Sequence, residues 1–392
     1  MSKNSNTKKF VSNINWMLFQ QIYSMVLSLV IGSLVARYLG PSNYGVLSYA
    51  TTLISFFTII SRLGIDSIII NELVTMPQKQ GTVLGTALVM RLISSVLSFI
   101  MVVMVILVIE PDDKLIQAVT ILQALAIIFQ VYEVFTYWFQ SKLKMKNVVI
   151  AIICALTAVG LWRVFLLAKG LSVQWFALAA SIQYIVTGIV VIFFYFSDKE
   201  SPKLRFNYLT SKRLFLKSYH FIVSGLAVTC YSKIDKIMIK KIIDNEAVGI
   251  YTIAVAISIL WEFVPHALIN SSRPLILEKR NKSYEEYIKS FQMLLLGITL
   301  LGVAVDFALI ILGKPIIRLL YGDAYIGAFL PLCFLIFSTN FAIIGTARSI
   351  WIIAEGHNKY PKYYILIGAL VNIVLNSFLI FGWELPVQQL LH

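Results

Sequence analysis

Charged side chains embedded in apolar sequence are the groups of this chain that could do chemistry. Eight cations fall within or at the ends of long apolar runs: Arg37, Arg62, Arg91, Arg163, Lys233, Lys236, Arg273 and Arg348. A charge at the centre of a membrane helix costs about 2.5–3.5 kcal/mol, so such groups normally face a cavity or a partner. We therefore treat all eight as candidates for lining a polar chamber.

Each cation also has a structural interpretation. Arg163, inside "ALTAVGLWRVFLLAKG", either faces a lumen or pairs with an acid of another helix. The arginines at helix ends can extend to the membrane surface, as long cationic side chains do. Lys233 and Lys236 share a stripe with Lys240, at i, i+3 and i+7 of "YSKIDKIMIKKIID". That stripe is either a solvated rim or the outer mouth of an anion path.

The acids within the apolar runs are fewer, and they are the candidates for binding a coupling ion. Together with one histidine they are Asp66, Glu133, Asp235, Glu262, His266 and Asp306. Glu262 and His266 are four residues apart in "WEFVPHAL", so a helix places both on one face, and we expect Pro265 to loosen the backbone between them. The pair either carries a proton or cation, or forms an acid–imidazole hydrogen bond across the bundle. The sequence contains no signature of a catalytic centre or of a metal site, so we expect no enzyme activity and no cofactor beyond H⁺ or Na⁺ coupling.

Composition identifies the elements that must position these groups. The 392 residues are 59% hydrophobic, with a mean hydropathy of +0.82, which exceeds the apolar content of soluble domains. Apolar runs of about 20 residues recur, the length that a helix needs to cross a bilayer. The chain is therefore predicted to be an all-α polytopic membrane protein. Six helices are expected at 16–36, 45–66, 83–109, 115–139, 148–168 and 173–196, and five more at 214–235, 248–270, 289–312, 325–350 and 362–383.

The net charge of +14 reflects topology rather than nucleic-acid binding. With the N-terminus in the cytoplasm, 23 of the 33 Lys and Arg residues fall on the cytoplasmic side, nine fall on the opposite side and Arg163 lies within a helix. This bias predicts a cytoplasmic N-terminus by the positive-inside rule. The three cysteines fall in predicted helices and do not suggest a disulfide.

The chain divides into two predicted bundles of helices. We expect an N-terminal transmembrane bundle at 1–197, a cytoplasmic linker at 198–213 and a C-terminal transmembrane bundle at 214–392. "ARYLGPSNYGVLSYA" aligns weakly with "KKIIDNEAVGIYTIA" 204 residues later, so that Gly45 meets Gly249 at the first turn of each half. Six helices return a chain to the side it started from, so the halves would be parallel repeats with a cavity between them. The second half has five predicted helices, and a twelfth is missing after Trp383.

Several segments together resemble the polysaccharide-biosynthesis family of Wzx-type flippases, within the superfamily that includes the MATE exporters and the lipid II flippase. The resemblance rests on "ARYLGPSNYGVLSYATTL", "RLGID", "YSKIDKIMI", "AVGIYTIA" and "ARSIWIIAEGHNKYPKYYILIGALVNIVLN", and it covers nearly the whole chain. Arg37 matches the basic position before the family's LGP turn, Asp235 the acid of its Asp-x-Ile-Met stretch, and Arg348 the basic residue that opens helix ten. The sequence departs from the family pattern after Trp383.

The resemblance implies a multi-pass flippase of the bacterial inner membrane. Its substrate would be an undecaprenyl-pyrophosphate-linked oligosaccharide, an O-antigen or capsule repeat unit, moved by alternating access through a cationic lumen. The eight cations would then bind the pyrophosphate. Membrane lipids, a polysaccharide polymerase and chain-length proteins are the further implied partners. Three alternatives stay open: a MATE-type cation or drug antiporter, a membrane glycosyltransferase or polymerase, and an inactive truncated flippase. The eight cations against five acids disfavour the first, and the short loops disfavour the second.

Overall fold

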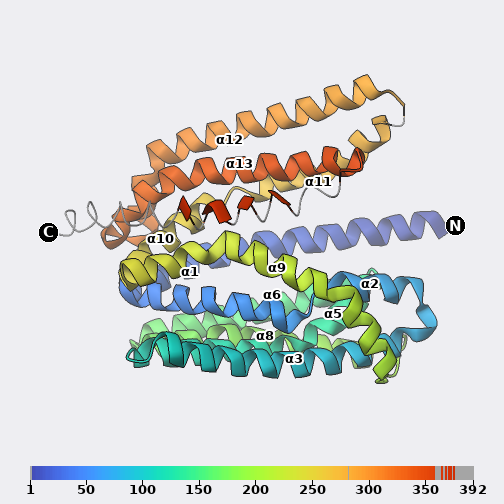
Figure 1. Ribbon diagram of the computed structural model, residues 1–392, viewed down its shortest axis with the longest axis horizontal. Coiled ribbons are helices and arrows are strands. Elements are labelled where there is room, and N and C mark those ends of the chain that lie inside the picture. Colours follow the sequence, from blue (N-terminus) through green and yellow to red (C-terminus); the bar gives the residue numbers. More distant parts are fainter. Residues whose placement is uncertain are drawn as a thin grey trace.

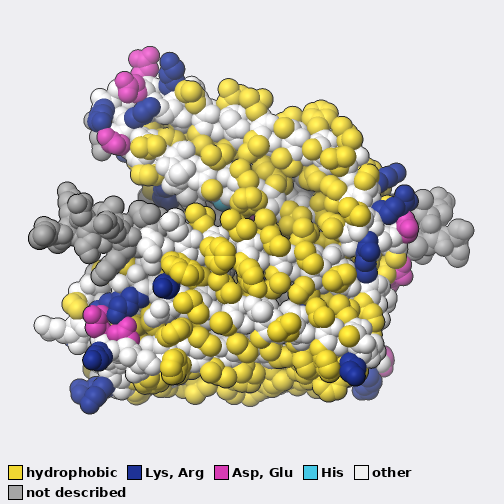
Figure 2. All heavy atoms as spheres, turned by 180° about the vertical axis from the view of Figure 1, so that it is seen from behind, with side chains coloured by type: hydrophobic (Ala, Val, Ile, Leu, Met, Phe, Trp, Pro, Cys, Tyr) yellow, Lys and Arg dark blue, Asp and Glu magenta, His cyan; other side chains and the backbone are white. Residues whose placement is uncertain are grey.

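Long helices lying side by side make up most of the described part of the chain (Figure 1). The computed structural model describes residues 2–280, 282–357, 363–364, 367–368, 370–372 and 374–375, and it describes side chains for these except 2–11 and 14. Figure 2 shows hydrophobic side chains covering the length of the molecule, with Lys, Arg, Asp and Glu gathered at its two ends. An apolar girdle between two charged ends is the surface that a bilayer requires.

The helices of the first half span residues 2–197. They are α1 (Ser2–Arg62), α2 (Asp66–Thr75), η1 (Pro77–Lys79), α3 (Gln80–Ile109), α4 (Lys114–Phe129), η2 (Gln130–Tyr132), α5 (Glu133–Ser141), α6 (Met145–Lys169), α7 (Val173–Ala177) and α8 (Ala179–Ser197). The later helices are α9 (Tyr208–Ile242), α10 (Asn245–Ser258), α11 (Phe263–Arg280), α12 (Tyr284–Tyr321), η3 (Asp323–Ala328) and α13 (Phe329–Ala354).

The prediction of an all-helical polytopic membrane protein is confirmed. Among the described residues, eight helices are long and apolar enough to cross a membrane, and the broken pair α10–α11 raises the number to nine. One of these, α1, contains two predicted spans, 16–36 and 45–66, on either side of a kink. The predicted span 362–383 and the predicted absence of a twelfth helix lie largely outside the described residues.

The kink in α1 falls at the Gly-Pro turn that the sequence singled out. Gly40 adopts φ 69° and ψ 170°, a left-handed conformation that glycine adopts without steric penalty. Pro41 then opens the next helical segment, where its missing N–H has no helical partner to lose. We call this end of the molecule the Gly40 end, and the opposite one, where α1 begins, the N-terminal end.

Side-chain caps fix the start of several helices. Asn207 Oδ1 accepts from the Thr210 N–H at the start of α9, and Asp244 Oδ1 accepts from the Ala247 N–H at the start of α10. The first cap makes α9 begin at Tyr208, six residues before the predicted start at 214. The second places the start of α10 at Asn245, which the 204-residue offset aligns with Pro41. The two restarts therefore correspond as the alignment predicted.

The segment between α8 and α9 lies against the first turns of α3. The Arg205 N–H donates to the Gly81 carbonyl at 3.0 Å, and the Lys144 Nζ donates to Asp198 Oδ2 at 2.6 Å. That hydrogen bond lowers the pKa of the Asp198 carboxyl below its ordinary value. The division of the chain at this linker (198–213) stays a prediction.

Four apolar cores hold the helices together. Two of them lie mainly among α1–α8, one at each end of the molecule. The third core joins α10 to α12, η3 and α13. The fourth joins α11 to α12 and α13. Buried Ala36 of α1 belongs to the third core, so α1 contributes to the packing of the C-terminal helices as well.

Candidate functional site

Four of the predicted site residues meet in one ion-pair network near the N-terminal end. Arg62 closes α1, Asp66 opens α2, Arg91 lies on α3 and Glu133 opens α5. Arg62 Nη2 lies 2.7 Å from Glu133 Oε1, and Arg91 Nη2 lies 2.9 Å from Glu133 Oε2. Arg91 Nη1 lies 3.5 Å from Asp66 Oδ1, which also accepts from the Tyr137 hydroxyl at 2.5 Å. Both carboxylates stand at the first position of a helix, where the helix dipole favours negative charge.

This network is balanced in charge and largely closed. The Arg91 side chain is fully buried and that of Glu133 is 14% exposed, whereas Arg62 and Asp66 are 36% and 37% exposed. The predicted roles divided these residues into two substrate-binding cations and two ion-coupling acids. The structure instead brings all four together as mutual partners, and in this conformation Arg91 presents no surface to a substrate. Direct substrate contact by Arg62 and Arg91 therefore stays a prediction, which for the buried Arg91 needs another conformation.

A second group of cations lies nearer the Gly40 end. Arg163 stands six residues before the end of α6 at Lys169, about 9 Å along the axis, and Lys236 stands six residues before the end of α9. The half-buried Arg163 side chain interacts electrostatically with the Tyr44 hydroxyl. No acid among the described residues forms an ion pair with Arg163 or with Lys233.

Asp235, between the two lysines, is occupied elsewhere. Its Oδ2 accepts a short hydrogen bond from the Tyr251 hydroxyl of α10, and its Oδ1 accepts from the Lys236 backbone N–H. The Lys236 ammonium is electrostatically coupled to this carboxylate but is not within ion-pair distance of it. The α9 stripe therefore keeps its ammonium groups largely unneutralised.

The last two arginines lie toward the N-terminal end. Arg273 on α11 is exposed and has no acid partner among the described side chains. Arg348 on α13 is also exposed, and its guanidinium lies 5.1 Å from the ring centroid of Tyr364. This cation–π contact stabilises the arginine without neutralising its charge.

Arg37 ties the two halves together at the Gly40 end. Its Nη2 donates to the carbonyls of Arg318 and Leu319, in the last turn of α12. A guanidinium there adds donors to the last carbonyls of the helix, one of which also accepts from the Gly322 N–H, and it complements the negative end of the helix dipole. Beside it the Tyr325 hydroxyl of η3 donates to the Ala36 carbonyl at 2.7 Å. In this conformation Arg37 thus binds the backbone of α12.

The two aligned glycines lie where α1 and α10 approach one another closely. An ideal Cβ on Gly45 of α1 would lie 1.7 Å from the Asn245 carbonyl oxygen, and one on Gly249 of α10 would lie 2.0 Å from the Pro41 carbonyl oxygen. Only glycine allows these two backbones to approach so closely. The Gly40 end is therefore closed by contact of the two restarts, whereas α11, at the N-terminal end, packs on α12 and α13.

Glu262 and His266 lie at a broken helix rather than within a continuous one. The chain bends by 41° between α10 and α11, and Glu262 precedes the first residue of α11. The expectation that Pro265 loosens the backbone between the pair is not met. Pro265 lies in the first turn of α11, where its missing N–H is tolerated, and the break in the helix lies before it. The two side chains still interact electrostatically, and the His266 N–H donates to the Glu262 carbonyl at 3.1 Å.

Asp306, like Asp235, has a neutral side chain as its described partner. It lies on the buried face of α12, 2% exposed, and its Oδ2 accepts from Asn340 Nδ2 of α13 at 2.8 Å.

Two buried acids that the sequence did not single out attach α9 to the first half. Glu72 of α2 is 3% exposed and binds Arg213 at 2.8 Å and Lys217 at 3.1 Å. Glu110, just after α3, binds Lys241 of α9 at 2.7 Å. Glu72 lies near the end of α2 and Glu110 lies just after α3. Both fall outside the predicted spans 45–66 and 83–109, so hydropathy does not mark them as membrane charges.

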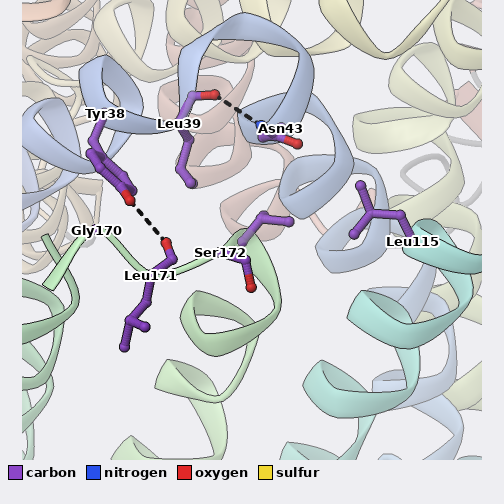
Figure 3. A pocket seen from close by; sticks show the side chains of 8 residues that line it. Tyr38, Leu39, Asn43, Leu115, Gly170, Leu171 and Ser172 are labelled. Atoms are coloured by element: carbon purple, nitrogen blue, oxygen red, sulfur yellow. Dashed lines mark hydrogen bonds between the residues drawn. The ribbon is translucent and has the colours of Figure 1, made fainter.

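A pocket of about 450 Å³ opens at the Gly40 end (Figure 3). It is lined by Tyr38, Leu39, Asn43, Leu115, Gly170, Leu171, Ser172 and Val173. The Tyr38 hydroxyl donates to the Leu171 carbonyl, and Asn43 Nδ2 donates to the Leu39 carbonyl, so its main polar groups are already satisfied. The pocket contains no charged side chain and is separate from the cations described above.

Comparison with solved structures shows the fold. The chain superposes on a multidrug resistance MATE family transporter of the MOP superfamily in an inward-facing conformation, with a TM-score of 0.58, 13% identity, and coverage of 92% of this chain and 95% of the other. It superposes on the eukaryotic MATE transporter AtDTX14 with a TM-score of 0.57, 12% identity, and coverage of 94% and 96%. At this identity the likeness shows a MATE-like fold and no more.

Sequence comparison shows the family. No curated protein matches the chain. The family model described as "Polysaccharide biosynthesis protein" matches residues 10–264, which include most of α1, all of α2–α10 and the whole ion-pair network around Arg91. The chain therefore belongs to the polysaccharide biosynthesis protein family.

Proposed function

We propose that this protein is a flippase for undecaprenyl-pyrophosphate-linked oligosaccharides, an O-antigen or capsule repeat unit, in the bacterial inner membrane. Family membership supports a role in polysaccharide biosynthesis, and the MATE-like fold supports transport rather than catalysis. The polar headgroup would pass between two bundles, 1–197 and 214–392, while the lipid tail stays in the bilayer.

The observation that carries this proposal is a set of membrane-depth cations without acid partners. Among the described residues, Arg163, Lys233 and Arg273 form no ion pair, and Arg348 contacts an aromatic ring. An uncompensated charge in a membrane helix is costly, so these groups are stable only beside water or a bound anion. A pyrophosphate supplies that negative charge, and its oxygens accept charge-assisted hydrogen bonds from guanidinium and ammonium donors.

The arrangement of the two ends supports alternating access. The positive-inside rule assigns the N-terminal end to the cytoplasm. In this conformation the Gly40 end is closed by Gly45 and Gly249 and by Arg37, so a headgroup would enter from the cytoplasmic end. Arg273 and Arg348 lie toward that entrance, whereas Arg163, Lys233 and Lys236 lie deeper. Movement from the first group to the second, followed by opening of the Gly40 end, would release the substrate outside.

The membrane potential favours this direction. An inside-negative potential contributes about 2.3 kcal/mol per elementary charge for each 100 mV when an anion moves outward. Exchange for a proton or sodium ion is a second energy source. Of the predicted carriers, Glu133 and Asp66 are bound by arginines and Asp235 is bound by Tyr251, which leaves Glu262 with His266, and Asp306.

A strain that lacks its own flippase tests the proposal. The gene is introduced with a panel of repeat-unit biosynthesis clusters, and surface polysaccharide is measured at matched protein levels. We expect the wild-type protein to restore surface polysaccharide with at least one cluster. Arg163→Gln should reduce that recovery at least tenfold, whereas Lys169→Gln, an exposed cation at the end of the same helix, should leave it within twofold.

The alternative is a MATE-type exporter of cationic drugs, which the fold alone would allow. Drug susceptibility in a strain without other exporters separates the two functions. Drug resistance that depends on Glu262 or Asp306, without restored polysaccharide, would replace the flippase proposal by the exporter.

A further inference from the structure

Two buried oxygens without partners stand within a single hydrogen-bonded side-chain pair between α12 and α13. Asn340 Nδ2 donates to Asp306 Oδ2 at 2.8 Å, and the two residues are 6% and 2% exposed. The remaining oxygen of each group, Asp306 Oδ1 and Asn340 Oδ1, is buried and has no hydrogen-bond partner among the described residues. Both atoms are acceptors when the carboxyl is ionised, so they cannot satisfy one another.

The backbone of α12 is shaped to hold the amide of this pair. Gly302 lies one helical turn before Asp306 on the same buried face. A Cβ on Gly302 would lie 1.7 Å from Asn340 Oδ1 and 2.4 Å from its Nδ2. The Asn340 amide therefore packs directly on the glycine, where even an alanine would displace it.

We propose that Asp306 and Asn340 form a proton-binding site. A proton on Asp306 Oδ1 converts that oxygen into a donor, and the amide oxygen of Asn340 is the unpaired acceptor of the same side-chain pair. The neutral acid and the amide then share two antiparallel hydrogen bonds, one from Nδ2 to Oδ2 and one from Oδ1 to Oδ1. Protonation forms one O–H bond at Asp306 Oδ1 with a proton taken from a hydronium ion, and when that bond breaks the proton returns to water. The assignment of this proton as the coupling ion of the transporter rests on the proposed function.

Burial favours the protonated form over the ionised one. A buried carboxylate without a cationic partner loses its hydration with little in return, and a neutral acid avoids that loss. The titratable groups on the elements packed against α12 include Cys333 and Arg348 on α13, His266 and Arg273 on α11, Tyr325 in η3 and Arg37 on α1. None of these described groups pairs with Asp306, whose single described partner is Asn340.

The same geometry disfavours a metal ion. Hard cations take about six or more oxygen ligands, and this pair offers two free oxygens. Among the described residues, no group of three or more His, Cys, Asp or Glu side chains is placed to hold a metal.

Infrared difference spectroscopy of the purified full-length protein in lipid tests the inference directly. The wild-type protein should show the C=O band of a protonated carboxylic acid at neutral pH, and Asp306→Asn should lack that component. Asn340→Leu and Gly302→Ala should shift its frequency because each removes or displaces the hydrogen-bond partner. Asp112→Asn, an exposed carboxyl outside the helices, should leave it unchanged.

A spectrum of Asp306→Asn that differs from wild type only by the loss of ionised-carboxylate bands would overturn the proton site. This measurement needs no substrate, so it separates the site from the transport function. A protonated Asp306 in a protein that restores no polysaccharide would contradict the flippase and leave the proton site intact. Restored polysaccharide with an ionised Asp306 would support the flippase and contradict the proton site.

Discussion

Removing the Glu133 carboxylate should destabilise the protein more than removing its buried arginine partner, Arg91. Glu133 binds Arg62 at 2.7 Å and Arg91 at 2.9 Å, and it is 14% exposed. In Glu133→Gln the fully buried Arg91 keeps only the 3.5 Å contact with Asp66 as an ion pair. Breaking a buried pair by removing one partner costs about 3–5 kcal/mol, and we expect about 3 kcal/mol because glutamine keeps one acceptor oxygen.

Removing Arg91 instead leaves both carboxylates of the network with a partner. In Arg91→Met, Glu133 retains Arg62, and Asp66 retains the Tyr137 hydroxyl at 2.5 Å. We therefore expect a loss of about 1–2 kcal/mol, the worth of hydrogen bonds to charged groups whose partners stay satisfied. Asp198→Asn, which breaks the pair with Lys144 outside the membrane helices, is the control and should cost about 1 kcal/mol or less.

Equilibrium unfolding in mixed micelles, followed by tryptophan fluorescence, measures the three free-energy changes. The predicted order of destabilisation is Glu133→Gln, then Arg91→Met, then Asp198→Asn. If Arg91→Met is at least as destabilising as Glu133→Gln, the network does not depend on a shared carboxylate and this reasoning is wrong.

Substitutions at three further positions test how α1, α2, α9, α10 and α12 are joined. Arg37→Ala should reduce surface polysaccharide at least fivefold at matched protein levels and Arg37→Lys by less, because the lysine keeps a cation at the end of α12; full activity of the alanine variant would remove Arg37 from the mechanism. Gly249→Leu should open the Gly40 end and speed labelling of an Ala36→Cys reporter by an impermeant thiol reagent, in a background with Cys154, Cys230 and Cys333 replaced by alanine. Gly32→Ala, which has open space around it, is the matched control, and equal labelling rates would show that the glycine contact does not close this end. Glu72→Gln should lower the free energy of unfolding by about 1–2 kcal/mol by freeing α9 from α2, whereas an unchanged value would show that Arg213 and Lys217 find water instead.

The sequence predicted the helices well because hydropathy alone defines them. A bilayer requires apolar spans of fixed length, so every predicted span up to 325–350 coincides with an observed helix or broken helix. The Gly-Pro turn was predictable for the same local reason, since the conformation at Gly40 depends on that residue and its neighbour. The predicted starts of the helices were less accurate. The Asn207 cap was the signal that could have placed the start of α9 correctly.

The partners of the charges were not predictable from one sequence. Arg62, Asp66, Arg91 and Glu133 come from four elements, and nothing in their spacing indicates that they meet. Pairing depends on the rotation and tilt of each helix, which packing sets. Asp306 was predictable as an acid within an apolar run. Its partner Asn340 was not, because it is uncharged and lies on another helix.

Binding of a labelled polyprenyl-pyrophosphate oligosaccharide to the purified protein tests the central claim, that unpaired membrane cations bind the pyrophosphate. A charge-assisted hydrogen bond contributes about 1.5–3 kcal/mol, so Arg163→Gln and Lys233→Gln should each raise Kd about tenfold or more. Lys169→Gln should leave Kd within twofold. Unchanged affinity in both Arg163→Gln and Lys233→Gln, with wild-type stability, would contradict the account.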